Sequence, residues 1–250
     1  LQKIIVQEPD TKQTIEIAKK IRPILEKFHN VRIKDEAINA ATKLSSRYIF
    51  DRFQPDKTID LLDEASAATN LKIENTYKAI EFAGKLPVEV VIINAESIKP
   101  GQKEQQFQEV VSRFQDFCTA AEKAGVTLAV EPEPDLVIHG LEDTLRLLEE
   151  VNSPQLGVNL DIGHLFITDG DLSAVINQLG KAIVYTHLED ISGKVHKHLL
   201  PGEGDIDFKE LITSLKSINY DGPLVFDLFG LENNHIEYAK EAYSYLQEIK

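Results

Sequence analysis

Five apolar runs of strand length alternate with segments of helical periodicity from about residue 77 onward. The runs lie at 88–94, 126–131, 156–161, 182–187 and 223–228, and the helical segments at about 103–124, 140–152, 171–180, 207–218 and 232–249. Successive strand–helix units predict a parallel sheet with right-handed crossovers, because parallel neighbours need a long connection that packs back onto the sheet. The alternation therefore predicts an α/β fold.

The first third of the chain differs in composition. All 13 glycines lie at Gly84 or beyond. Residues 1–76 carry 13 basic and 12 acidic side chains, whereas the remainder carries 14 basic and 29 acidic ones. A glycine-free segment is typical of continuous helix, because glycine is the usual residue of turns. We therefore expect a small all-α segment over residues 1–75 and a separate α/β part over 76–250.

Composition also bears on partners and location. The formal net charge of −14 argues against nucleic acid or a membrane surface as a partner, since binding of phosphates needs clustered Lys and Arg. The single cysteine, Cys118, lies on the apolar side of an expected helix, so we expect its side chain to pack in the core. A lone cysteine without a disulfide partner also indicates a protein of a reducing compartment. Without an apolar run long enough to span a bilayer, we expect a cytoplasmic protein. Because the chain begins at Leu1 and contains no Met, we expect a fragment or a processed product.

Polar residues stand at the ends of four expected strands. Glu131, Asp161 and Asp227 end three of them, and His187 ends a fourth. Because the carboxyl ends of parallel strands meet at one rim, these side chains are expected to converge, and buried carboxylates need pairing or a metal. Oxygen and imidazole ligands suit Mn²⁺, Mg²⁺, Co²⁺ or Zn²⁺. Taken alone, the stretch 157–164 is equally compatible with Asp161 capping a turn and His164 covering the core.

An ordered set of motifs then carries a resemblance to a known family. The motifs are Val130-Glu131-Pro132, Gly157-Val158-Asn159-Leu160-Asp161-Ile162-Gly163-His164, Thr186-His187-Leu188-Glu189-Asp190, Gly202-Glu203-Gly204-Asp205 with the preceding His198, and Tyr220-Asp221-Gly222-Pro223-Leu224-Val225-Phe226-Asp227. Residues 76–250 resemble the xylose isomerase-like (β/α)₈ superfamily, which includes sugar-phosphate isomerases and epimerases and the apurinic endonucleases. The resemblance implies one divalent ion, Mn²⁺ first, held by Glu131, Asp161, His187 and Asp227. It also implies a substrate pocket lined by His164 and His198.

A second resemblance lies in the helical segment. Leu44-Ser45-Ser46-Arg47-Tyr48-Ile49-Phe50-Asp51-Arg52-Phe53-Gln54-Pro55-Asp56-Lys57-Thr58-Ile59-Asp60-Leu61-Leu62-Asp63-Glu64-Ala65 is similar to the helical lid subdomain of Clp-type AAA+ disaggregases. Gln54 and Thr58 depart from that family, which usually has Leu and Ala there. The resemblance would place Pro55, Asp56 and Ile59 near the adenine of ATP. No phosphate-binding G-x-x-x-x-G-K-[ST] loop occurs in the chain, so we expect no ATPase activity.

The two resemblances together describe an apparent hybrid chain. The five runs correspond to barrel strands four to eight, so the expected fold is a partial (β/α) TIM barrel of about five units after a helical segment. Five strands cannot close such a barrel. A partner, such as another copy of the chain, is one way to cover the open sheet edge.

Three functions stay open from the sequence. The first is a metal-dependent isomerase or epimerase of a small sugar, sugar phosphate or polyol, in which Glu131 and Asp227 move a proton next to a carbonyl. The second is a catalytically silent hybrid that acts as a structural or binding module. The third is an apurinic endonuclease-like metal hydrolase, which the acidic charge disfavours.

Overall fold

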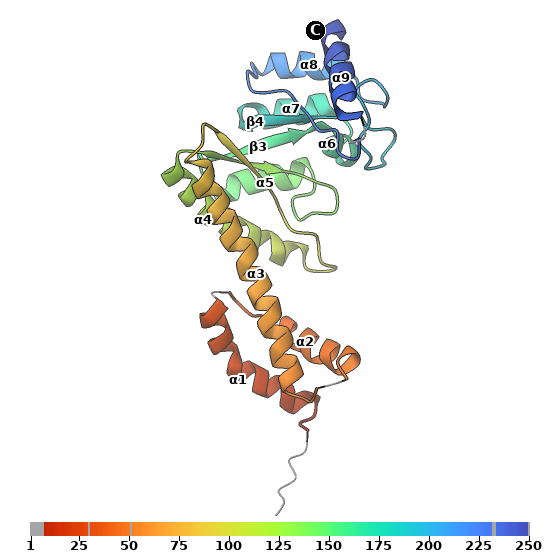
Figure 1. Cartoon of the computed structure of the whole chain (residues 1–250). Helices are drawn as coiled ribbons and strands as arrows, with labels where there is room; N and C mark the ends of the chain where they lie inside the picture. The colour runs from red at the N-terminus through yellow and green to blue at the C-terminus, as the bar shows by residue number, and fades with distance from the viewer. Residues whose placement is uncertain (1–7, 30, 51, 232–233, 250) are drawn as a thin grey trace, which may run out of the picture. The chain divides into compact units, whose positions relative to one another are not determined.

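Figure 1 shows the computed structural model, which describes residues 8–29, 31–50, 52–231 and 234–249. The chain divides into two compact units, Leu1–Lys78 and Ala79–Lys250.

Three helices build the first unit. They are α1 (Thr11–His29), α2 (Asp35–Tyr48) and α3 (Asp56–Ala83). Their apolar faces meet in one core, formed by Ala18, Leu25, Ile33, Ile38, Ala41 and Leu62. The expected all-α segment is therefore helical, with helix starts at Thr11, Asp35 and Asp56. Helix α3 continues through residues 74–78, where the composition changes, as far as Ala83.

Gln54 and Thr58, the two departures from the Clp pattern, contact each other. The Thr58 hydroxyl donates to Gln54 Oε1 at 2.6 Å, and Gln54 Nε2 donates to the Ser45 hydroxyl at 3.0 Å. Thr58 and Ser45 are fully buried. Gln54 and Thr58 stand where the Clp family usually has apolar residues, and their side chains form a hydrogen bond with each other. This bond offsets most of the free-energy cost of burying either polar side chain alone.

The second unit is a five-stranded parallel sheet with helices. Its strands are β1 (Val90–Asn94), β2 (Thr127–Glu131), β3 (Leu156–Asp161), β4 (Ile183–Leu188) and β5 (Val225–Phe226), in the spatial order β1-β2-β3-β4-β5. The sheet is curled like half of a barrel. Its helices are α4 (Lys103–Ala124), α5 (Leu141–Val151), α6 (Ile162–Thr168), α7 (Leu172–Leu179), the 3₁₀ turn η1 (Gly180–Ala182), α8 (Phe208–Ser217) and α9 (His235–Ile249). The predicted partial barrel is confirmed.

The central strands have the burial expected of a parallel sheet. Every residue of β3 is buried, and four of the five residues of β2 are buried. Strands of this kind have continuous apolar sequences because both faces of the sheet are buried. The edge strands are less protected, since β1 is only partly buried and β5 has two residues.

Helix ends in this unit follow common capping patterns, and one short helix was not predicted. Gly125 ends α4 in the left-handed conformation, with φ of 72°, and the Asp207 side chain caps α8. The short helix α6 was not expected. It begins directly where β3 ends, and Asp161 serves as its N-cap by accepting from the His164 backbone N–H at 2.8 Å. The last residue of the strand therefore also starts the next helix.

Candidate metal centre

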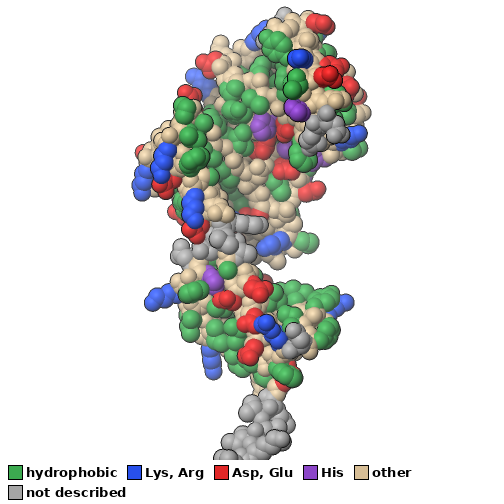
Figure 2. All heavy atoms as spheres, viewed as in Figure 1, with side chains coloured by type: hydrophobic (Ala, Val, Ile, Leu, Met, Phe, Trp, Pro, Cys, Tyr) green, Lys and Arg blue, Asp and Glu red, His purple; other side chains and the backbone are tan. Residues whose placement is uncertain are grey.

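The polar residues predicted at the strand ends gather at the carboxyl rim of the sheet. Parallel pairing places Asp161 opposite His187 across β3 and β4. On the face of this unit seen in Figure 2, histidine and acidic side chains lie close together. Ligand atoms of Glu131, Asp161 and His187 all lie within 4.8 Å of one another. The register thus brings three of the four predicted ligands to one point.

Glu131 is held by amide side chains. Asn159 Nδ2 donates to Oε1 of Glu131 at 2.8 Å, and Asn94 Nδ2 donates to Oε2 at 3.0 Å. His187 Nδ1 lies 2.8 Å from the same Oε1 atom. Both oxygens of this buried carboxylate are therefore positioned from neighbouring strands, as in metal sites where outer contacts orient a ligand.

Asp161 is fully buried, and its Oδ2 atom has no hydrogen-bond partner within the described part of the chain. Burial opposes the charged form, but the His187 imidazole, the His164 charge and the His164 backbone N–H outweigh burial and lower the pKa of Asp161 to about 2. Oδ2 is therefore a charged, buried oxygen without a hydrogen bond of normal length, and its charge is favoured by the neighbouring His187 ring and Glu189 carboxyl. A divalent ion bound to Oδ2 would offset the cost of burying this charge further.

His187 faces the carboxylates. Its Nδ1 atom lies 3.7 Å from Asp161 Oδ2 as well as beside Glu131. Burial opposes the imidazolium, but Asp161 and Glu131 outweigh burial and raise the pKa of His187 to about 10. The protonated ring thus supplies the positive charge that two buried carboxylates require.

Asp227 lies at the margin of this group. Its backbone N–H donates to Leu188 O, which continues the β4–β5 ladder, and its side chain is one-third exposed. Oδ2 lies 3.9 Å from His187 Nδ1, while Oδ1 accepts from the Phe229 N–H at 3.1 Å. The structure brings the carboxylate near the other three residues but not into the tight group. Its ligand role stays a prediction.

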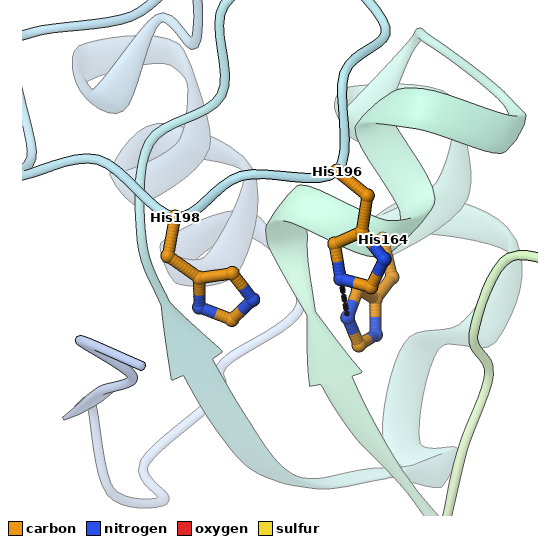
Figure 3. Close-up of side chains that lie close together, drawn as sticks. All are labelled: His164, His196 and His198. Atoms are coloured by element: carbon orange, nitrogen blue, oxygen red, sulfur yellow. Dashed lines mark hydrogen bonds between the residues drawn. The ribbon is translucent and has the colours of Figure 1, made fainter. Parts of the chain in front are cut away.

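Three histidines form a second cluster beside the first. Figure 3 shows His164 at the start of α6, and His196 and His198 on the loop after β4. The Nε2 atoms of His164 and His196 lie 2.9 Å apart, and the rings of His196 and His198 stack with centroids 5.6 Å apart. Ligand atoms of all three lie within 4.8 Å of one another. This cluster could hold a metal ion as well.

The backbone sets the orientation of two of these rings. His164 Nδ1 lies 3.1 Å from Pro132 O, and His198 Nδ1 lies 3.2 Å from Asp227 O. Because a carbonyl only accepts, each Nδ1 donates its proton to the backbone oxygen beside it. The sequence prediction of His164 and His198 as site residues missed His196. That residue is exposed on a loop, where only its i, i+2 spacing from His198 gives a signal.

Glu189 lies behind the first cluster and is fully buried. Its Oε1 atom accepts from the Gly163 N–H at 2.5 Å. Burial and the negative charge of Asp161 raise the pKa of Glu189 well above its ordinary value. The neutral form of Glu189 is therefore favoured beside the charged Asp161, which lessens the repulsion between two adjacent buried carboxyl groups.

Both clusters border one pocket of about 610 Å³. Glu131, Asp227 and the three histidines line it, together with Asn94, Glu133, Lys197 and Phe229. A larger cavity of about 1050 Å³ lies at the opposite, amino-terminal ends of the strands and contains none of the predicted ligands. The chemistry is therefore concentrated at the carboxyl rim, as in other parallel α/β proteins.

The fold and this rim define a parallel α/β half-barrel with a carboxylate–histidine centre suited to a divalent metal ion. The sequence profile described as "Xylose isomerase-like TIM barrel" matches residues 13–249. The chain belongs to this family.

Curated relatives match a shorter part of the chain. The chaperone protein ClpB of Bacteroides thetaiotaomicron is 41% identical over 118 residues, which is 44% of this chain and 14% of that protein. ClpB of Aquifex aeolicus is 52% identical over 80 residues, 32% of this chain and 8% of that protein. The chain thus spans about a seventh or less of the length of these relatives. They support the resemblance to the Clp family.

Solved structures share the fold at low identity. A D-tagatose 3-epimerase-like protein has a TM-score of 0.62 with 23% identity, covering 86% of this chain and 84% of its own. The IolI protein with a bound zinc atom has a TM-score of 0.62 with 22% identity, covering 70% and 69%. A family 2 AP endonuclease from Brucella melitensis has a TM-score of 0.55 with 24% identity, covering 61% and 60%. Within the part of the chain that the structure describes, no helix is long and apolar enough to cross a membrane.

Proposed function

We propose that this chain is a metal-dependent isomerase or epimerase that moves a proton next to the carbonyl of a small sugar or polyol. The observation that carries the proposal is the convergence of Glu131, Asp161 and His187 at the carboxyl rim, with the unpartnered Oδ2 of Asp161 among them. Structural similarity to a D-tagatose 3-epimerase-like protein supports the reaction class. Similarity to IolI, which binds zinc, supports a divalent ion, with Mn²⁺ and Zn²⁺ as first candidates.

Glu131, Asp161 and His187 would hold the ion, with Asp227 as a fourth ligand. When bound, such an ion withdraws electron density from hydroxyl and carbonyl oxygens and makes the neighbouring C–H group more acidic. The Asn94 and Asn159 amides fix the Glu131 carboxylate in position. Deprotonation of His187 would leave an imidazole lone pair directed at the same point.

Proton transfer would fall to Glu131 and Asp227. Asp227 is one-third exposed, and its Oδ2 atom is turned toward His187, so it can reach a carbon-bound proton of a ligand in the pocket. Glu131 borders the same pocket from another strand. Two carboxylates from different strands suit removal of a proton by one and its return by the other.

Hydrogen exchange tests this proposal. The full chain, loaded with Mn²⁺ or Zn²⁺, is incubated with a panel of ketoses and aldoses in D₂O, and deuterium entry next to the carbonyl is followed by NMR. Exchange should occur and should be lost in Asp227→Asn. Asp221→Asn, at the other end of β5, is the matched control and should keep the rate. Absence of exchange with every sugar would leave the silent hybrid as the better account.

The three-histidine cluster favours a second candidate, a metal hydrolase of the apurinic endonuclease type. Displacement at a phosphodiester is often assisted by two metal ions, and His164, His196 and His198 offer a second position beside the first. The formal net charge of −14 counts against binding DNA. Cleavage of a DNA duplex with one abasic site, dependent on His196, would favour this candidate over the epimerase.

We further propose that the chain is a hybrid of a Clp lid-like unit and a half-barrel. The different charge balance of the two parts and the Clp relatives support this. Limited proteolysis tests the domain boundary: cleavage should fall first in the exposed stretch of α3 around Glu74–Lys78 and release two resistant fragments. Protection of that stretch would argue for one folding unit.

A further inference from the structure

Both edges of the parallel sheet lack a second neighbouring strand. Within the described part of the chain, β1 pairs with β2 alone and β5 pairs with β4 alone. Edge strands are usually protected against further pairing by charged side chains, proline or a bulge. Residues 90–93 of β1 are Val-Val-Ile-Ile and contain neither charge nor proline. This edge strand therefore has the sequence of an inner strand.

The ladder shows which main-chain groups of β1 face the open edge. The Thr127 N–H donates to Glu89 O at 2.8 Å, and Val90 lies opposite Thr127. In a parallel ladder, residues bonded to one neighbouring strand alternate with residues whose N–H and C=O point to the other side. Val90 and Ile92 therefore direct these groups away from β2, where they need a further strand or water.

The edge at β5 offers the complementary groups. The Asp227 N–H donates to Leu188 O at 3.0 Å, and Phe226 lies opposite Leu188. By the same alternation, Phe226 directs its N–H and C=O away from β4. All neighbouring strands of the sheet run parallel. The free edge of β5 can therefore pair with the free edge of β1 from another copy, in the way that β4 pairs with β5.

Side chains on the two edges agree in the face that they present. Asn94 and Asp227 border the pocket at the carboxyl rim. Ile92 and Val225 stand two residues earlier in these segments, so they lie on the same concave face of the sheet. Both are only partly buried. Pairing of the two edges would cover Ile92 of one copy and Val225 of the other together.

The curl of the sheet sets the number of copies. Five strands form about half of a barrel. A second half, related by a two-fold rotation about the barrel axis, meets the first at both edges and leaves no edge open. The cavity of about 1050 Å³ at the amino-terminal ends, lined by Val90 and Tyr185 among others, then becomes part of the barrel interior.

Helix α9, which follows β5, has an apolar stripe that its own unit leaves uncovered. Its buried residues are Ala242 and Leu246. Ile236 and Tyr243 are 61% and 59% exposed, and with the exposed Ala239 they follow helical spacing. A helix after a strand packs back over the gap between that strand and the next one. The next strand at this edge would be β1 of the second copy.

We propose that two copies of this chain close one barrel of ten strands, in which β1 of each copy pairs in parallel with β5 of its partner. A second copy fits both edges because one chain carries both complementary edges and half of the curl. The net charge of −14 opposes association, but residues 90–93 and 223–226, which form the two seams, contain no charged side chain. The proposal does not depend on a metal ion or a sugar.

The oligomeric state tests this directly. Sedimentation equilibrium of the full chain over a range of concentrations should give twice the mass of 28.1 kDa, with no further growth. A monomer at every concentration would overturn the inference, and proton exchange by that monomer would leave the proposed function intact. Assemblies that lengthen with concentration would mean an open chain of copies and would also overturn the closed barrel.

Proline variants locate the contact. Val90→Pro and Phe226→Pro each remove an N–H that faces an open edge, where an unpaired edge strand tolerates proline. Each should weaken dimerisation by at least about tenfold, with the fold confirmed by circular dichroism. An equal mixture of the two should dimerise more tightly than either alone, because one seam of the mixed dimer keeps both original edges. A dimer that only Val90→Pro weakens would join two β1 edges, and a dimer that neither variant weakens would use another surface. Either result would overturn the inference.

A side-chain variant tests the seam without a change to the backbone. Ile236→Asn, at an exposed position of α9, should weaken dimerisation by at least about tenfold. Val195→Asn is the matched control, since Val195 is 65% exposed on the loop after β4, and it should dimerise like the unaltered chain. Unchanged dimerisation of Ile236→Asn would contradict the arrangement.

Discussion

His187 Nδ1 lies 2.8 Å from Glu131 Oε1, although 56 residues separate the two in the sequence. The contact joins the ends of β2 and β4 across the end of β3. It couples a buried carboxylate to an imidazole whose pKa is raised from 6.5 to about 10.

This pair predicts a pH dependence of stability. Because the folded pKa of His187 lies above its unfolded value, the contribution is fully present below about pH 6.5 and is lost as the pH rises toward 10. In chelator, the melting temperature should fall over that window more steeply for the unaltered chain than for His187→Gln. Parallel melting curves across the window would contradict the assigned contact.

Two substitutions of Glu189 should differ in their effect on the free energy of unfolding. Since burial and Asp161 keep its carboxyl neutral, Glu189→Gln should change the free energy of unfolding little. Glu189→Ala leaves the Gly163 N–H without its acceptor and should cost about 1–3 kcal/mol. Chemical denaturation measures both changes. A strongly destabilised Gln variant would mean that the carboxyl is charged.

Much of this arrangement follows from simple rules about parallel sheets. The five apolar runs predicted the strands, and the placement of Glu131, Asp161 and His187 at strand ends predicted their convergence, because register in a parallel sheet aligns those ends. The ends of two helices agree with general residue preferences: α4 ends at Gly125 and the Asp207 side chain caps α8.

Other features depend on contacts that local patterns do not reveal. The helix α6 has seven residues and contains Gly163, so neither length nor propensity indicated it; it forms because Asp161 caps it. His196 lies on a loop without periodicity and joins the site only through folding. The change of composition near residue 76 suggested a break, whereas α3 continues to Ala83.

Asn159 is predicted to position Glu131. It is fully buried and donates to Glu131 Oε1 at 2.8 Å. Asn159→Leu should weaken divalent-metal affinity by about 10–100-fold, the usual effect of removing a group that orients a ligand. Calorimetric titration with Zn²⁺ checks this, and circular dichroism confirms that the variant folds. An unchanged affinity for Zn²⁺ would mean that Asn159 does not position a metal ligand.

The helical unit is predicted not to bind ATP. The chain has no phosphate-binding loop, so millimolar ATP should leave the melting temperature unchanged. A rise of several degrees that grows with ATP concentration would contradict this.

The central claim is that Asp161 holds a divalent ion together with Glu131 and His187. The direct measurement is titration of chelator-treated protein with Zn²⁺ and Mn²⁺, comparing the unaltered chain, Asp161→Asn and Asp205→Asn. The Asp161 variant should lose more than the roughly 10–100-fold typical of outer contacts. It should keep its fold, because an amide of the same shape removes a buried charge. Asp205 is not among the predicted ligands, and its Oδ2 atom accepts from the Gly193 N–H. In Asp205→Asn the side-chain oxygen can still accept this bond. The metal affinity of Asp205→Asn should therefore equal that of the unaltered chain. Equal affinity of the unaltered chain and Asp161→Asn would contradict the account.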